Sequence, residues 1–198
     1  MLVRHRNAEP SVDASAYVAP SAVLVGDVRI GPGVRVLHCA VVTAEDGTVI
    51  VGENSVIMEH ALIRGRAEHP ARIGSEVMIG PHAHINGSSV GHGAFIATGA
   101  SLFPGSQVGA GAEVRINGVV QVNTVIEQGA VVPIGWVAVG DPAAILSPDR
   151  HEEIWAIQRE LDFPGTVYGV SRDVSMRELM RQQSDYYGAH RKDQIVAS

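Results

Sequence analysis

The chain has 198 residues, of which 45% are hydrophobic and 18% are charged, and its formal net charge is −6. This length suits one domain with an appendage. An acidic chain without a stripe of Lys and Arg is not expected to bind nucleic acid. The single cysteine, Cys39, excludes an intramolecular disulfide framework. Because no run of about 18 apolar residues occurs and the start MLVRHRNAEP has no apolar stretch, we expect no membrane partner, no secretory signal and a cytoplasmic location.

A six-residue repeat follows a lead-in of residues 1–17 and runs from residue 18 to residue 146. Nearly every segment opens with Ile, Val or Leu and carries a small or β-branched residue at its fifth position. The early segments include VAPSAV, IGPGVR, VLHCAV, VGENSV, IMEHAL and IRGRAE. From Ile73 they read IGSEVM, IGPHAH, INGSS, VGHGAF, IATGAS, LFPGSQ, VGAGAE, VRINGV, VQVNTV, IEQGAV and VPIGWV. A repeat of this length is typical of a solenoid.

The six-residue period fits neither a helix of 3.6 residues per turn nor a long alternating strand. It fits a short strand followed by a tight bend, in which positions one and five point inward and position two points outward. Gly, Asn, Asp or His at the bend tolerates a left-handed backbone. Three segments would then close one triangular coil, and stacked coils would lie about 4.8 Å apart, as strands of a sheet do. A β-sandwich, with turns every 8–12 residues or so, fits the pattern less well.

Helices and a tail are expected over residues 147–198, after a DPA break ends the coil. Ser147 is the expected cap of a first helix through HEEIWAIQREL, with a Pro in its first turn, and FPG is expected to end it. A second helix is expected from Ser175, which forms a capping box with Glu178. We expect the chain to fray from Asp185 onward. The helices would cover one face of the solenoid or a neighbouring subunit.

Residues 18–146 resemble the γ-class carbonic anhydrases of the hexapeptide-repeat superfamily. The motifs that carry the resemblance are VAPSAVLVGDVRIGPG, AVVTAEDGTVIVGEN, IGSEVMIGPHAHING with its shortened segment, and VGDPAAIL at the end of the coil. The resemblance covers about two-thirds of the chain and includes the order of segments and insertions. It implies a left-handed parallel β-helix that assembles as a homotrimer and a zinc enzyme acting on CO₂ or bicarbonate.

The positions that match the zinc ligands of that family hold other residues here. The family's three histidines align with Arg64, Pro81 and Asn86, and its RGDxG motif reads TAEDG, with Thr43 in place of Arg and Glu45 in place of Asp. Arg cannot deprotonate to bind zinc, and Pro has no side-chain donor. The resemblance therefore does not by itself imply ordinary carbonic anhydrase activity. The Asn and Gln that flank the family site are replaced as well, by Val56 and Met58.

A displaced site is suggested by the stacking of the segments. His60 and His82 occupy the fourth position of segments one coil apart, so their imidazoles could reach one zinc ion, with bonds of about 2.0–2.1 Å. His84, Cys39 or a histidine of a neighbouring chain could supply a third ligand. The alternative is that these histidines only tolerate the bend and bond to nearby carbonyls. The histidines of termini and loops, His5 and His190 among them, are expected at the surface.

The expected site combines zinc on His60, His82 and His84 with a carboxylate and an anion-binding group. Glu59 or Glu45 would orient the zinc-bound water or carry its proton, and Arg64 with Asn86 would face an anionic small-molecule substrate. The leading hypothesis is a zinc-dependent hydratase or lyase acting on CO₂, bicarbonate or a related small carboxylate. The alternatives are a hexapeptide acyltransferase that uses acyl-CoA and a non-catalytic trimeric scaffold. We expect a homotrimer in each case, since a prism has three flat, valine-rich faces.

Overall fold

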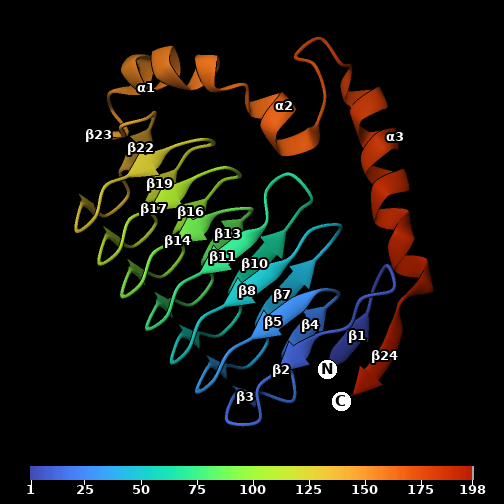
Figure 1. The fold of residues 1–198 in the computed structure, drawn as a ribbon. Helices are drawn as coiled ribbons and strands as arrows, with labels where there is room; N and C mark the ends of the chain where they lie inside the picture. Colours follow the sequence, from blue (N-terminus) through green and yellow to red (C-terminus); the bar gives the residue numbers. More distant parts are fainter. Residues whose placement is uncertain (198) are drawn as a thin grey trace.

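The computed structural model describes residues 1–197, and it describes side chains over residues 1–196. The chain winds into a solenoid of three parallel sheets with a helical C-terminal segment (Figure 1). This confirms the predicted architecture. The first sheet contains eight parallel strands, so the solenoid has about eight coils. These strands are β1 (Leu2–Arg4), β4 (Val23–Val25), β7 (Val41–Ala44), β10 (Leu62–Gly65), β13 (His84–Asn86), β16 (Ser101–Leu102), β19 (Val119–Val120) and β22 (Val137–Val139).

Two more strands extend the first sheet at its ends, and both run antiparallel to their neighbours. They are β23 (Ala144–Leu146), next to β22, and β24 (Gln194–Ala197), next to β1. The second sheet comprises β2 (Ser11–Val12), β5 (Val28–Ile30), β8 (Val49–Val51), β11 (Ala71–Ile73), β14 (Ser89–Val90), β17 (Gln107–Val108) and β20 (Val125–Ile126). The third sheet comprises β3 (Tyr17–Val18), β6 (Arg35–Val36), β9 (Val56–Ile57), β12 (Met78–Ile79), β15 (Phe95–Ile96), β18 (Glu113–Val114) and β21 (Val131–Val132).

The repeat explains both the core and the bends. First-position residues such as Ile79, Ile85 and Leu102 are fully buried, and they fill the inside of the solenoid with aliphatic side chains. Fourth-position residues have positive φ, for example His60 at 59° and His82 at 58°. Only a few residue types tolerate that conformation, which explains why Gly, Asn and His recur there. Strands lie within the predicted lead-in too, since β1 and β2 are paired with β4 and β5.

The C-terminal segment differs in detail from the prediction. The first helix, α1 (His151–Gln158), is preceded by Arg150 rather than capped by Ser147, and it continues as a 3₁₀ turn, η1 (Arg159–Leu161). FPG does not end the helical region. It opens α2 (Phe163–Tyr168), because the side chain of Asp162 caps the new helix and Pro164 sits in its first turn.

The second predicted helix is confirmed as α3 (Met176–Tyr187), whose cap Ser175 accepts a hydrogen bond from the Glu178 N–H at 3.2 Å. The chain does not fray after Asp185, since α3 leads into a 3₁₀ turn, η2 (Gly188–Lys192), and then into β24. Figure 1 shows α3 running back along the solenoid, so that both chain ends lie close together beside β1. Among residues 1–197, no helix combines the length and the apolar character needed to cross a bilayer.

Candidate functional site

Three positions that align with functional residues of the γ-carbonic anhydrases lie side by side on the outer face of the first sheet. Arg64 on β10 pairs in register with Thr43 on β7 and with Asn86 on β13. The guanidinium Nε of Arg64 lies 3.7 Å from a carboxylate oxygen of Glu45, so a permanent cation occupies this part of the sheet. Zinc does not fit here, because the residues offer a cation and a neutral amide instead of imidazoles. The alignment of Arg64 with Asn86 agrees with the stacking predicted from the repeat.

Glu45 is buried at the centre of this face, with only 4% of its surface exposed. Its Oε1 accepts a hydrogen bond from the Thr43 hydroxyl at 3.1 Å, and its Oε2 lies 2.9 Å from Nε2 of His190 in η2. Arg64 stands beside Glu45 at a distance too long for a hydrogen bond. The C-terminal segment therefore contributes directly to the group of residues that the sequence placed at a displaced site.

A cavity of about 540 Å³ lies between this face and helices α2 and α3. Three polar atoms of residues that line it have no hydrogen-bond partner, namely Nε of Arg64, Nε2 of His84 and Oδ1 of Asn86. Burial lowers the pKa of His84 below its ordinary value, and the neighbouring charge of Arg64 lowers it further, so its imidazole is neutral at pH 7. The other lining residues are mostly apolar or aromatic: Arg66, Phe103, Phe163, Val167, Tyr168, Met180, Gln183, Ser184 and Tyr187.

The predicted histidine pair is present at the bend between the third and first sheets. The rings of His60 and His82 are stacked, with centroids 5.0 Å apart and planes inclined by 3°. Both residues are exposed, and Cys39 occupies the equivalent bend position with φ of 62°. His84 lies apart from the pair, since it faces the cavity and contacts the ring of Phe103 edge-on. His60, His82 and His84 do not form a group whose ligand atoms all lie within 4.8 Å of one another.

Glu59 lies in the same bend, and its backbone carbonyl accepts a hydrogen bond from the N–H of His82 at 3.1 Å. The roles predicted for its side chain and for zinc at this bend stay predictions.

A different group of residues has the composition of a metal site. Ligand atoms of His5, Glu45 and His190 all lie within 4.8 Å of one another, so this cluster could hold a metal ion. The expectation that His5 and His190 lie at the surface is wrong for His5, which is 2% exposed, and His190 is only partly exposed. The physical reason is the C-terminal segment, which packs against the first sheet. The two rings stack with centroids 4.2 Å apart.

The carboxylate of Asp193 joins the two imidazoles of this cluster. It accepts hydrogen bonds from Nδ1 of His5 at 2.6 Å and from Nδ1 of His190 at 2.8 Å. Burial acts to lower the pKa of His190, but the hydrogen bonds to Asp193 and Glu45 outweigh burial and raise it. No repeat or motif connects residues 5, 45 and 190, so sequence reasoning had no signal for this cluster. The one local hint is the spacing of His190 and Asp193, three residues apart in the C-terminal tail.

Comparison with known proteins agrees with the repeat, although no family model matches the chain. γ-Carbonic anhydrase 1, mitochondrial, of Arabidopsis thaliana is 36% identical over 102 residues, which cover 45% of this chain and 37% of that protein. Carnitine operon protein CaiE of Escherichia coli O1:K1 / APEC is 33% identical over 82 residues, which cover 41% of this chain and 42% of that protein. The chain thus spans about two-fifths of the length of these curated relatives.

Among solved structures, a hexapeptide transferase family protein from Anaplasma phagocytophilum is 21% identical, with a TM-score of 0.47 over 95% of this chain and 93% of that chain. The chain is therefore a γ-carbonic-anhydrase-like hexapeptide-repeat β-solenoid protein, distantly homologous to the Arabidopsis γ-carbonic anhydrases and to CaiE.

Proposed function

We propose that this protein is a γ-carbonic-anhydrase-like enzyme that binds bicarbonate or a related small carboxylate in the cavity between the first sheet and helices α2 and α3. The observation that carries the proposal is the set of unpartnered polar atoms on Arg64, His84 and Asn86. Buried polar groups are nearly always hydrogen-bonded, so unpartnered groups on residues that line a cavity favour a polar ligand as their partner. A fold-level likeness alone would not support an activity.

The three groups suit the two ends of a bicarbonate ion. The Arg64 guanidinium donates hydrogen bonds and matches a carboxylate in charge. The Asn86 carbonyl oxygen accepts, and a bicarbonate hydroxyl can donate to it. Neutral His84 can accept a proton. In the hydration direction, water adds to CO₂ while His84 takes one proton, so that CO₂, water and neutral imidazole give bicarbonate and imidazolium. Solvent would then remove the proton from the imidazolium.

Zinc at the bend remains a separate prediction. His60 and His82 would supply two ligands, and Glu59 would orient a bound water. Since His84 faces the cavity, the third ligand would come from Cys39 or from a neighbouring chain. No step of the proposed cavity chemistry depends on that ion.

One observation favours acyl transfer as the alternative activity. Part of the cavity wall is apolar, with Phe103, Phe163 and Met180 among its lining residues. Such a wall suits an acyl chain, and the neutral imidazole of His84 could act as base toward a hydroxyl or amine. An acyl-CoA would also need partners for its phosphates, and Arg66 is the further cation that lines this cavity.

The two activities can be separated by experiment. We expect bicarbonate or acetate to bind the purified protein, and Arg64→Gln to weaken that binding at least about tenfold by removing a charge-assisted hydrogen bond. CO₂ hydration should fall in His84→Ala. Arg72→Gln, on the outer face of the second sheet, is the matched control and should change neither quantity. Binding of acyl-CoA without binding of small carboxylates would reject the proposal in favour of acyl transfer, and binding of neither would favour a scaffold.

We also propose that the protein is a homotrimer that uses the third sheet as its contact surface. Val56, Met78 and Phe95 lie in register on neighbouring strands of that sheet. Met78 and Phe95 are 40% and 39% exposed, so an apolar row faces outward. Contiguous exposed apolar surface of this kind is typical of protein–protein contacts. Light scattering of the purified protein should give three times the mass of the chain, and a monomer would contradict the proposal.

A further inference from the structure

We propose that His5, Glu45 and His190 bind a divalent cation of the zinc class, with Asp193 orienting both imidazoles, and that this ion fastens the C-terminal segment to the solenoid. The cluster shares Glu45 with the face that carries Thr43, Arg64 and Asn86, but it is distinct from the His60–His82 pair and from the positions that match the family's zinc ligands. It joins three separate parts of the chain, since His5 follows β1, Glu45 follows β7 and His190 lies in η2. The proposal does not rest on the proposed cavity chemistry.

The donor set fits zinc. Two imidazole nitrogens and one carboxylate oxygen are typical zinc ligands, with bonds of about 2.0–2.2 Å. In the structure, His190 Nε2 and Glu45 Oε2 are 2.9 Å apart, and one ligand atom from each of the three residues lies within 4.8 Å of the others. Small side-chain movements would bring all three around one ion, and a water molecule would fill the fourth tetrahedral position.

The hydrogen bonds already set the ring orientation that a metal requires. Histidines that bind metals usually donate their second ring N–H to a carboxylate, which fixes the tautomer. Asp193 accepts from Nδ1 of both His5 and His190. This leaves Nε2 of His190 facing a carboxylate oxygen of Glu45, and two acceptors at that distance need a positive centre between them. Either a proton or a metal ion can supply it.

His5 also presents a ring nitrogen that can bind the ion. Its Nε2 accepts a hydrogen bond from Nε of Arg6 at 3.2 Å, which places the ring proton on Nδ1. Arg6 is exposed, so its guanidinium can turn away when an ion takes its place. The second nearby cation, Arg64, lies 3.7 Å from the other oxygen of Glu45, Oε1. The two carboxylates, Glu45 and Asp193, offset the charge of the ion.

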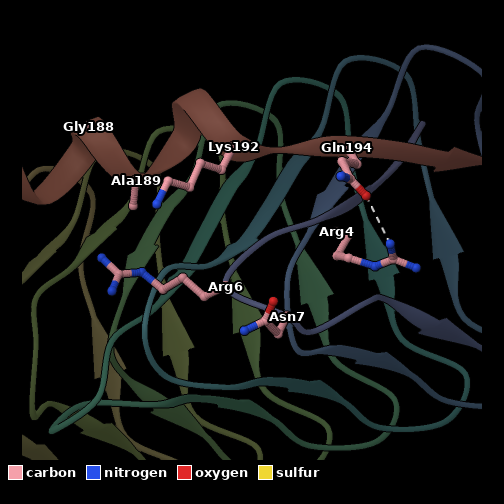
Figure 2. A pocket seen from close by; sticks show the side chains of 7 residues that line it. All are labelled: Arg4, Arg6, Asn7, Gly188, Ala189, Lys192 and Gln194. Carbon is pink, nitrogen blue, oxygen red and sulfur yellow. Dashed lines mark hydrogen bonds between the residues drawn. The ribbon is translucent and has the colours of Figure 1, made fainter.

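The chain segments that carry His5 and His190 also enclose a pocket next to the cluster in sequence. A pocket of about 680 Å³ lies between the N-terminal segment and the C-terminal segment, and Figure 2 shows its lining side chains. Arg4 and Arg6 flank His5 in the chain, and Ala189 precedes His190. Arg4 is tied to Gln194 across the pocket by a hydrogen bond of 2.9 Å (Figure 2). The pocket therefore lies along the contact between the N-terminal and C-terminal segments, which the ion would hold together.

The test is zinc binding to the full chain, after chelation and dialysis, followed by calorimetry and by metal content per chain. We expect at least one zinc ion per chain and a higher melting temperature when zinc is added. His190→Ala should weaken zinc binding at least about 100-fold, and Asp193→Asn about 10- to 100-fold. His151→Ala is the matched control, because it removes an exposed histidine of α1 that belongs to neither histidine pair, and its zinc affinity should equal that of the parent.

A further variant separates loss of a ligand from loss of docking. Glu45→Gln keeps an oxygen that accepts from His190, so the C-terminal segment should stay in place by hydrogen exchange, while zinc binding falls at least about tenfold. The proposal is overturned if the parent chain binds no zinc, or if Glu45→Gln and His190→Ala bind it as the parent does. If zinc binding is instead lost only in the double variant His60→Ala/His82→Ala, the ion lies at the bend and the proposal is equally overturned.

Discussion

The protein contains two stacked pairs of histidines that arise in different ways. His60 and His82 stack with a ring distance of 5.0 Å because the repeat places equivalent bend positions one coil apart. His5 and His190 stack at 4.2 Å although 185 positions separate them, because the C-terminal segment docks on the N-terminal end of the first sheet. The first pair is exposed. The second pair is tied to the carboxylates of Glu45 and Asp193.

In a solenoid, the stacking of two like residues is by itself weak evidence for a functional site. A regular repeat stacks like residues on every coil, whatever their chemistry, so stacking of His60 on His82 follows from the fold. The second pair has no such explanation, since nothing in a six-residue period brings positions 5 and 190 together. Specific hydrogen bonds hold these two histidines in place, so we expect them to contribute more to the free energy of unfolding than His60 and His82 do.

The largest expected effect follows from removing a buried member of the second pair. His5→Ala in metal-free protein should lower the free energy of unfolding by about 2–3 kcal/mol, since it removes a packed ring and leaves the Asp193 carboxylate with one fewer donor. Urea denaturation measures the change. His60→Ala should change the stability by less than about 0.5 kcal/mol, as expected of an exposed side chain. Equal losses at both positions would remove the distinction between the pairs.

A second prediction concerns the backbone at the bend. His60 has φ of 59°, a conformation that costs side chains with a Cβ about 1–2 kcal/mol and glycine nothing. His60 already bears this cost, but a β-branched side chain adopts positive φ much more rarely than His does, so His60→Val should destabilise the protein by about 1 kcal/mol. His60→Gly removes the cost of the Cβ and should leave the stability within about 1 kcal/mol of the parent. Thermal denaturation of the two variants compares them at one position. If Gly and Val were equally harmful, the imidazole itself would matter at this bend.

The sequence predicts the parts of the molecule that repeat and misses those that do not. The inward positions, the positive φ at bends and the register of Arg64 with Asn86 all follow from a six-residue period. The docking of residues 188–197 does not, because it depends on contacts of η2 and β24 with β1 and β7 that only tertiary packing defines. His84 was expected beside His82, but it lies past the bend, on β13 of the first sheet, and therefore faces the cavity.

The smallest expected effect concerns helix α3, which positions His190 of the second pair. Ser175 caps α3 by accepting a hydrogen bond from the Glu178 N–H, and α3 leads directly into η2 with His190. Ser175→Ala should cost about 1 kcal/mol of helix stability. Because α3 belongs to the C-terminal segment and to no coil of the solenoid, the lost helix stability should appear as faster hydrogen exchange in residues 176–196. Exchange in residues 56–85 should be unchanged. Ser175→Asp should restore the slow exchange, since Asp caps a helix as well as Ser does. Faster exchange at the bend of His60 and His82 would show instead that the segment and the solenoid unfold as one unit.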